Sequence, residues 1–345
     1  MNARIKKLAG SLEEPLIVTG EANIRYLTGF VSSNVSLVVE PDRVRLFTDF
    51  RYATAARAVP DVEFVETRRL VITHMAELLS GTFGFDSEHL TYAAYEELGE
   101  GGLELVPRKG LVERLRAVKD EGEIEKIRRA AEVTNRAYEQ FAEEQFVGRT
   151  EKELAWRMTS LLHELGAEDV SFETIVAGGA NGARPHADPT DHPIEPNTTV
   201  VVDAGGVVDG YCSDCTRTFA TGELPDELAR AYEICLDAQL KGLEAARAGV
   251  EGKQADAAAR SVIADAGLGE KFGHGLGHGV GIDVHEAPSV AATSEDTLVA
   301  NNVCTIEPGI YLEGVGGIRI EDLVVITDGE PEVLSGFPKE LVTVS

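Results

Sequence analysis

Three histidines fall close together in a glycine-rich stretch at residues 273–286. They are His274, His278 and His285, and every second residue from 273 to 281 is glycine. Three charged imidazoles so near one another would repel, so neutral rings that bind a metal or face a substrate explain the cluster better. The glycines would let a backbone or a ligand approach closely. On this stretch alone, a glycine-rich loop with solvated histidines is an equally good explanation, so residues elsewhere must decide.

Two aspartates lie in apolar, strand-like segments earlier in the chain. Asp203 ends the run Val-Val-Val-Asp, and Asp214 lies in the segment 211–219, which we expect to form one strand. Glycines at positions 205, 206 and 210 predict a hairpin turn between them. A buried strand aspartate is costly unless it is paired or binds a metal. Two such carboxylates on adjacent strands would raise each other's pKa, and a divalent cation would relieve their repulsion.

Two glutamates repeat this pattern near the C-terminal end of the sequence. Glu307 follows the apolar run 303–306, and Glu321 lies in the run 317–325. Arg319 stands two residues before Glu321, so both would share one strand face, and we expect Arg319 to orient that carboxylate. Any one of these acids could be a surface charge, but four acids in apolar strands together with His278 are harder to explain that way.

The candidate metal ligands are mostly carboxylates with a single imidazole. The set has too many carboxylates for a structural zinc site and too many members for one tetrahedral ion. It suits two metal ions about 3.5 to 4 Å apart, bridged by carboxylates and a hydroxide. Manganese, cobalt, iron or zinc could occupy such a site. The five residues are Asp203, Asp214, His278, Glu307 and Glu321.

The elements around these residues occur twice in the same order. Apolar residues at steps of three and four predict a helix from about Asp120, and a second helix is predicted from Thr150 to Leu165. A strand at 172–177 follows, and then His186. Two further helices, expected at 224–248 and 253–266, precede the glycine-rich stretch and His285. A diverged internal repeat would therefore place His186 and His285 at equivalent positions, both facing a shared centre.

The first part of the chain contains no cluster of residues suited to catalysis. Its composition predicts an α/β unit over residues 1–117, with strands at 37–40 and 44–48 and helices near 52–59 and 92–98. Residues 118–345 form the second predicted domain. Cys212 and Cys215 form a C-x-x-C, but on one strand they would point to opposite faces, which argues against zinc or redox chemistry.

Composition restricts the classes of partner. The chain has 345 residues, a net charge of -27 and a sequence pI near 4.7. Such acidity disfavours binding to nucleic acid or to anionic membranes, because both need a basic surface. No apolar run reaches the length of a membrane span and no signal peptide is evident, so we expect a cytoplasmic protein. The acids are spread along the chain, which suggests a surface adapted to a salt-rich interior.

The second part, about residues 120–345, resembles the metallopeptidase family of methionine aminopeptidase, aminopeptidase P and prolidase, which has the pita-bread fold. The family's five metal ligands fall on the five residues listed above for the metal pair. The first part resembles the creatinase-type N-terminal domain of aminopeptidase P and prolidase, through residues 23–30 and 48–52. The resemblance thus implies a mixed α/β (α+β) chain with a creatinase-like domain and a catalytic domain built on a pseudo-two-fold internal repeat.

The resemblance also implies roles for the site residues and a dinuclear centre, with manganese or cobalt expected first. A metal-bridging hydroxide would attack the peptide bond, and Glu307 would be both ligand and proton shuttle. His285 would hydrogen-bond the developing oxyanion, and His186 would assist at the scissile nitrogen. His274 matches a histidine near the proline pocket, and Arg319 matches the arginine that supports the last ligand.

These features predict an Xaa-Pro aminopeptidase, which acts on peptides with proline at the second position. The resemblance further implies a homodimer. Some prolidases have an arginine shortly after the His-Glu pair, where it can hold the substrate carboxylate, but this chain has Ser289. Arg184, before Pro185 and His186, is also more polar than the family pattern. The alternatives are a prolidase, which would be restricted to dipeptides, and a non-catalytic binding protein of the same fold.

Overall fold

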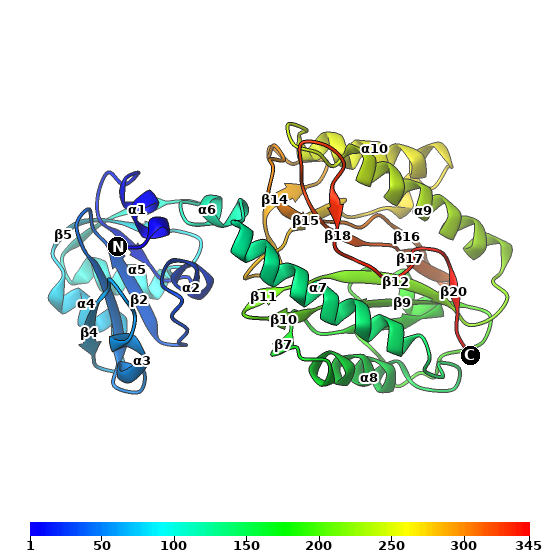
Figure 1. Cartoon of the computed structure of the whole chain (residues 1–345), viewed down its shortest axis with the longest axis horizontal. Helices are drawn as coiled ribbons and strands as arrows, with labels where there is room; N and C mark the ends of the chain where they lie inside the picture. Colours follow the sequence, from blue (N-terminus) through cyan, green and yellow to red (C-terminus); the bar gives the residue numbers. More distant parts are fainter. The chain divides into compact units, whose positions relative to one another are not determined.

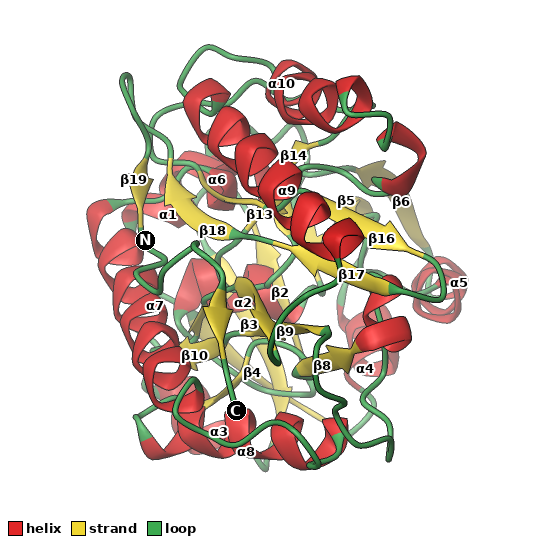
Figure 2. Cartoon of the chain, turned by 90° about the vertical axis from the view of Figure 1, so that its right-hand side faces the viewer, coloured by secondary structure: helices red, strands yellow, loops and turns green.

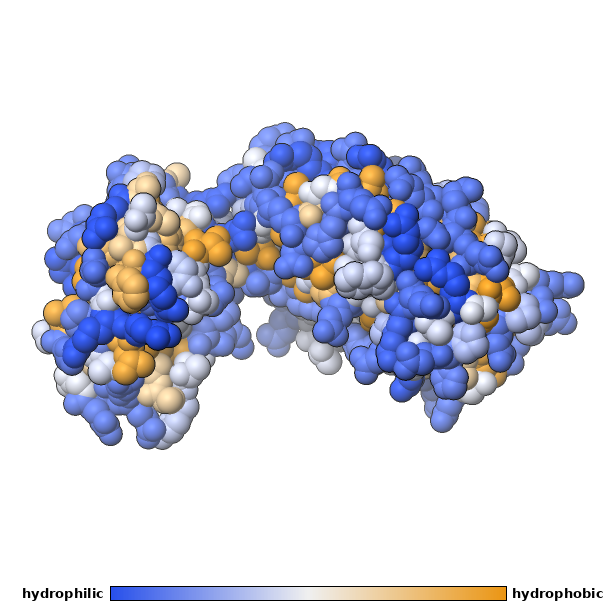
Figure 3. All heavy atoms as spheres, turned by 90° about the horizontal axis from the view of Figure 1, so that it is seen from below, coloured by the Kyte–Doolittle hydropathy of each residue, from blue (hydrophilic) through white to orange (hydrophobic).

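The computed structural model describes residues 1–345, which divide into two compact units, Met1–Arg116 and Ala117–Ser345 (Figure 1). Each unit has its own buried core. None of the helices combines the length and apolar composition that a membrane span needs. On the face shown in Figure 3, hydrophilic residues predominate and hydrophobic residues are scattered among them.

The first unit is a six-stranded mixed sheet with helices. The strand order is β4-β3-β2-β1-β5-β6, in which β2 runs antiparallel to both of its neighbours. The strands are β1 (Leu16–Val18), β2 (Val35–Val39), β3 (Val44–Asp49), β4 (Glu63–Thr67), β5 (Gly81–Asp86) and β6 (Leu103–Arg108). The helices are α1 (Ala3–Ala9), α2 (Glu21–Thr28), α3 (Ala53–Arg57), α4 (Val71–Leu78), α5 (Tyr92–Glu100) and α6 (Glu113–Ala117). The strands predicted near 37–40 and 44–48 and the helices near 52–59 and 92–98 are confirmed.

The second unit begins with two helices whose ends follow from local sequence. In α7 (Glu121–Phe141), Asp120 and Glu123 form a reciprocal capping box, and in α8 (Glu151–Glu164), Thr150 and Glu153 form another. The predicted apolar face of α7 is buried. After α8 come β7 (Asp169–Val170), β8 (Ile175–Gly178) and the 3₁₀ turn η1 (Gly179–Ala183), then β9 (Thr199–Ala204), β10 (Gly206–Val208), β11 (Tyr211–Cys212) and β12 (Cys215–Ala220).

The second half of this unit repeats the order of the first. The predicted helix pair is present as α9 (Asp226–Ala245) and α10 (Gly252–Asp265). After them come η2 (Gly269–Lys271), β13 (Gly277–Gly279), β14 (Glu286–Val290), β15 (Val303–Ile306), β16 (Gly309–Leu312), β17 (Gly316–Arg319), β18 (Asp322–Val325), β19 (Glu332–Val333) and β20 (Val342–Thr343). Two helices followed by strands therefore occur twice, as the expected internal repeat requires.

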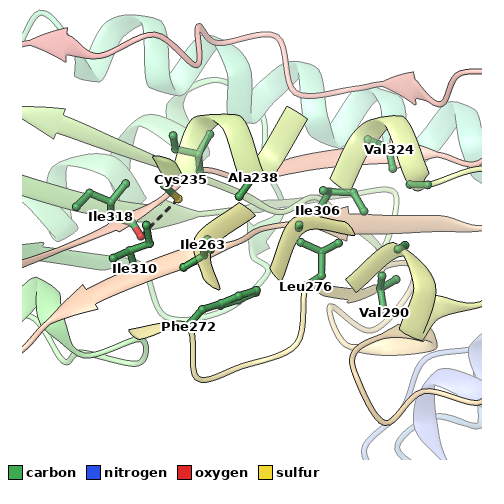
Figure 4. Packing of buried hydrophobic residues seen from close by; sticks show 14 of the residues in the cluster. Cys235, Ala238, Ile263, Phe272, Leu276, Val290, Ile306, Ile310, Ile318 and Val324 are labelled. Carbon is green, nitrogen blue, oxygen red and sulfur yellow. Dashed lines mark hydrogen bonds between the residues drawn. The ribbon is translucent and has the colours of Figure 1, made fainter. Parts of the chain in front are cut away.

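Each helix pair covers its own group of strands. Residues of α7 and α8 share one apolar core with residues of β8, β9 and β12, which lie in the sheet β20-β12-β9-β8. Residues of α9 and α10 share another core with strands β14–β18, as Figure 4 shows for Cys235, Ile263 and Ile306. Figures 1 and 2 show the two helix pairs on opposite sides of these strands. The strand residues that face neither helix pair are thus free to line a site between the halves.

The segment 211–219 corrects one prediction. It is not a single strand, because β11 ends at Cys212 and β12 begins at Cys215. The predicted hairpin is present, since β10 pairs with β11 around Asp209 and Gly210, both at positive φ. The Ser213 N–H then donates to the Gly206 carbonyl, 3.0 Å away, which redirects the chain before β12. Asp214 therefore lies in the break between the strands. Both cysteines are buried, and neither is part of a disulfide.

Candidate active site

One cavity of about 540 Å³ in the second unit brings the sequence-predicted site residues together. Its walls come from both halves of the repeat, and every predicted site residue lines it. Those residues are His186, Asp203, Asp214, His274, His278, His285, Glu307, Arg319 and Glu321. Positions more than 130 residues apart in the sequence thus converge on one site.

The five candidate ligands lie on strands or directly beside them. Asp203 is on β9 and His278 on β13, whereas Asp214 lies between β11 and β12, Glu307 after β15, and Glu321 between β17 and β18. The glycines beside His278 are needed for close packing, since a Cβ on Gly277 would collide with the Thr305 carbonyl. The strands provide rigid backbone, so these side chains approach one another without a flexible loop.

The ligand atoms are close enough to share a cation. One possible ligand atom from each of Asp214, His278 and Glu321 lies within 4.8 Å of the other two. The His278 Nε2 atom is 3.6 Å from Asp214 Oδ2 and 3.3 Å from Glu307 Oε1. His278 Nδ1 lies 3.1 Å from the Gly279 carbonyl, which only accepts, so Nδ1 carries the proton and Nε2 faces the carboxylates.

Asp203 supplies a direct test of whether a metal fits. Its Oδ2 accepts a hydrogen bond from Arg319 at 2.6 Å, whereas its buried Oδ1 has no hydrogen-bond partner. Buried polar atoms are normally satisfied, and an unpaired carboxylate oxygen among other carboxylates suits a hard divalent cation. The donor set present therefore fits a metal centre.

The electrostatics of the carboxylates lead to the same conclusion. Burial raises the pKa of Asp214 well above its ordinary value, and the charges of Glu321 and Asp203 add to the rise. Burial and the charges of Glu307 and Asp203 also raise the pKa of Glu321. For Glu307, burial opposes ionisation, but the hydrogen bond and the charge of His278 lower the pKa to about 2. The site has more buried negative charge than its own cations neutralise, so divalent ions would stabilise it.

Arg319 does not contact Glu321 as the sequence predicted. Its Nη2 atom donates to Asp203, and its Nε atom donates to the Thr216 hydroxyl at 3.0 Å. Thr216 in turn donates to Glu321 Oε2 at 2.7 Å, so Arg319 reaches Glu321 only through Thr216. The physical reason is that β9 and β12 pair with Asp203 opposite Thr216, which places both within reach of the guanidinium. Thr216 lies two residues after Asp214, and only this spacing in the sequence could have indicated that Thr216 lies near the site.

Tyr311 on β16 is a second residue that the sequence analysis missed. Arg319 Nη1 donates to its hydroxyl at 3.0 Å, and the hydroxyl lies 2.9 Å from His274 Nε2. His274 Nδ1 is 2.8 Å from the Gly275 carbonyl and therefore carries the proton, so Nε2 accepts from Tyr311. Burial lowers the pKa of His274, which keeps the ring neutral. Both nitrogens are then engaged, and His274 presents only its ring surface to the cavity.

The two remaining histidines are held differently. The His285 ring lies 4.2 Å from the His278 ring, centroid to centroid, and burial followed by the charge of His278 lowers its pKa. His186 is exposed in the cavity, after η1 and directly after Pro185. These two rings come from opposite halves of the repeat, as predicted.

The cavity contains no spare cation for an anionic substrate. Arg319 is the only lysine or arginine that lines it, and its guanidinium already donates to Asp203, Thr216, Tyr311 and the Pro185 carbonyl. Ser289 lines the wall, where an arginine would have offered a positive charge. Glu173 and Asp188 also line the cavity.

Comparisons with known proteins cover nearly the whole chain. The model of metallopeptidase family M24 matches residues 125–328, and the model of the creatinase/prolidase N-terminal domain matches residues 4–118. The chain is 33% identical to the Xaa-Pro dipeptidase of Pyrococcus horikoshii, over 99% of both chains.

Solved structures are similar over the same extent. A structure of the Xaa-Pro dipeptidase from Bacillus anthracis is 36% identical, with a TM-score of 0.95 and 99% of each chain covered. A structure of the X-Pro aminopeptidase from Thermotoga maritima is 34% identical, with a TM-score of 0.88, covering 99% of this chain and 100% of that one.

Proposed function

Because the chain belongs to metallopeptidase family M24, we propose that it is a divalent-metal-dependent Xaa-Pro dipeptidase. The observation that carries the proposal is the cluster of four buried or half-buried carboxylates around His278 in one cavity, with an unpaired Asp203 oxygen. The choice of dipeptidase over the aminopeptidase expected from sequence is supported by the relatives from Pyrococcus and Bacillus anthracis, which are named Xaa-Pro dipeptidases.

The five ligands would hold two divalent ions, with manganese or cobalt as the first candidates. Bound there, the ions would polarise the scissile carbonyl and lower the pKa of the attacking water. The Glu307 carboxylate is ionised at neutral pH, because His278 lowers its pKa, so it has a free acceptor for the proton that the attacking water would release. Thr305 donates to Glu307 Oε1 at 2.9 Å and fixes the orientation of that carboxylate.

The histidines would act on the peptide bond itself. His285 is neutral because its pKa is lowered, and a neutral imidazole N–H can donate to an oxyanion as it forms. His186 reaches the cavity from the other half of the repeat, where it would assist at the scissile nitrogen. The ring of His274, whose nitrogens are both occupied, would form an uncharged wall against proline.

A specific observation favours an Xaa-Pro aminopeptidase as the second candidate. A dipeptide places its free carboxylate next to proline, and the cavity has no spare arginine or lysine to bind it. A longer peptide has an uncharged amide at that position. This chain is also similar over nearly its whole length to the aminopeptidase from Thermotoga maritima, so the cleavage experiment must distinguish the two activities.

We further propose that the protein works in the cytoplasm as a homodimer. Its substrate is a peptide, and it binds neither nucleic acid nor membranes. The net charge of -27 supports the exclusion of nucleic acid. The dimer rests on the family resemblance, and light scattering of the purified protein tests it.

The deciding experiment is a cleavage panel on protein that has been stripped of metal and reloaded. We expect no cleavage after chelation, up to two ions bound on reloading, and cleavage of Gly-Pro restored by manganese or cobalt. Gly-Pro-Ala should be a poor substrate, and if it is cleaved faster than Gly-Pro, the aminopeptidase is correct. Full activity without metal would refute the metallopeptidase mechanism. His285→Ala is the control, because it should keep the metal and lose about 10²- to 10⁴-fold in turnover.

A further inference from the structure

Glu151 is a buried carboxylate that has no positively charged partner. It is the first residue of α8, and only 2% of its surface is exposed. No lysine, arginine or histidine forms an ion pair with it; instead it accepts four hydrogen bonds. The donors are the Gly178 N–H at 2.8 Å, the Asn181 side-chain amide at 2.7 Å, and the Thr190 N–H and hydroxyl at 2.8 and 2.6 Å. The partial positive charge at the start of α8 also favours this carboxylate.

The donors to Glu151 stand at both ends of one loop. Gly178 ends β8 and Thr190 lies twelve residues later, and His186 is between them. Asn181 strengthens the closure, since its amide also donates to the Asp188 carbonyl at 3.1 Å. Backbone hydrogen bonds from Glu151 and Lys152 to the carbonyls of His192 and Thr190 hold the returning chain against the start of α8.

The His186 ring has no comparable support of its own. No hydrogen bond to the ring is present, and the side chain is exposed in the cavity. Apart from the Glu151 contacts, the middle of the loop is held where Arg319 donates to the Pro185 carbonyl at 3.0 Å. The position of the imidazole therefore depends on the backbone of residues 178–190, and the two ends of that backbone meet at Glu151.

We infer that Glu151 is a positioning residue for His186. Glu151 holds the loop 178–190 so that the His186 imidazole reaches the scissile bond. The inference rests on the proposed peptidase function. Glu151 itself does not line the cavity, so it acts only through the loop. Misplacing a reacting group by about 1 Å can cost about 10²-fold in rate, which makes such anchoring measurable.

The other half of the repeat offers an internal comparison. Asp256 on α10 accepts from the Leu276 N–H at 3.0 Å and pairs with Arg260, which donates to the Phe272 and His274 carbonyls. A buried carboxylate on the second helix thus holds a histidine-bearing segment in each half. Asp256 should influence His274, and Glu151 should influence His186.

The test is a double-mutant cycle with the metal-loaded enzyme. Glu151→Gln keeps the shape but replaces one carboxylate oxygen by an NH₂ group, which cannot accept from the loop donors. We expect its kcat to fall about 10- to 100-fold with little change in KM. In a His186→Ala background the same change should cost less than about twofold, because the group that Glu151 positions is already absent. Asp256→Asn, which should act through His274, is expected to change kcat by the same factor in the His186→Ala background as in the wild type.

Two further variants keep the test decisive. Thr190→Val removes one of the four donors and should show a smaller loss with the same dependence on His186. Glu153→Gln, which alters the cap of α8 and does not touch the loop, should keep wild-type kcat. Losses of Glu151→Gln and His186→Ala that simply add, or a wild-type kcat in Glu151→Gln, would overturn the inference.

Amide hydrogen exchange separates this inference from the proposed function. Peptides covering residues 178–192 should exchange faster in Glu151→Gln than in wild type or Glu153→Gln, because the Gly178 and Thr190 amides donate to different oxygens of Glu151 and one of them loses its acceptor. Unchanged exchange would contradict the anchoring. If wild-type protein cleaved no Xaa-Pro peptide, the proposed function would fail, whereas faster exchange confined to this loop would still support the anchoring by Glu151.

Discussion

At the scale of single residues, the Tyr311 hydroxyl connects the metal-site arginine to the histidine beside the cavity. It accepts from Arg319 and donates to His274, so its proton must stay in place for the chain of hydrogen bonds to exist. Burial raises the pKa of Tyr311 to about 12, although Arg319 opposes the rise. The phenol is therefore protonated throughout the neutral range, and His274 keeps a donor at Nε2.

Tyr311→Phe should damage both stability and activity. It leaves a buried Arg319 N–H and the His274 Nε2 without partners, which costs about 1–3 kcal/mol of unfolding free energy. We expect turnover to fall about 10- to 100-fold, as for other groups that orient metal ligands. Denaturant unfolding and steady-state kinetics measure the two effects. Tyr92→Phe, at an exposed position of the first unit, is the control and should change neither. A Tyr311→Phe enzyme with wild-type kinetics would contradict the role of this network.

At the scale of elements, helix α7 is tied to the two strands next to the metal site. The buried Tyr138 hydroxyl lies 2.9 Å from the Val202 carbonyl on β9 and 2.6 Å from the Cys215 carbonyl on β12. These residues are direct sequence neighbours of Asp203 and Asp214. The helix therefore contributes a buried surface to the core and also bonds to β9 and β12 next to the candidate ligands Asp203 and Asp214.

Tyr138→Phe and Tyr232→Phe separate these two contributions. Each change removes one hydroxyl from a buried tyrosine, so each should lower the unfolding free energy by about 1 kcal/mol. Tyr232 on α9 donates to the Lys339 carbonyl at 2.7 Å, and Lys339 is not next to a candidate ligand in the sequence. Only Tyr138→Phe should weaken metal binding, measured by titration calorimetry. Equal metal affinities in the two variants would show that the bonds from α7 to β9 and β12 do not support the metal site.

At the scale of the whole molecule, the acidic surface should make stability depend on salt. The chain has 59 Asp and Glu residues against 32 Lys and Arg, and hydrophilic residues cover most of the face in Figure 3. Many of the arginines pair with carboxylates, for example Arg157 with Glu144 and Arg108 with Glu14. These local pairs oppose the general repulsion but cannot neutralise a charge of -27.

The protein should therefore be more stable and more active in molar potassium chloride than in dilute buffer. Repulsion acts over a Debye length of about 30 Å at 0.01 M salt and only about 3 Å at 1 M. Thermal melts across this range, with saturating metal, measure the effect, and a weakly charged homologue should gain less. A melting temperature that is constant or falls with salt would exclude the salt adaptation and leave the peptidase proposal unaffected.

Local sequence was sufficient for much of the fold. The capping residues Asp120 and Thr150 and the apolar spacing after them predicted α7 and α8, because a helix depends on contacts three and four residues apart. The four acidic candidate ligands could also be proposed from sequence, since a carboxylate in an apolar strand needs a partner wherever that strand packs. The recurrence of two helices before a histidine predicted that two halves would face one centre.

Only the tertiary structure decided which groups meet. Arg319 pairs with Asp203, 116 residues away, and not with Glu321 two residues away, because strand pairing and the packing of the two halves set that distance. Tyr311 and Glu151 are ordinary residues in the sequence, and their hydrogen bonds form only once β16 lies beside His274 and the loop 178–190 returns to α8. Periodicity and caps report on neighbours along the chain, whereas these contacts depend on the packing of distant segments.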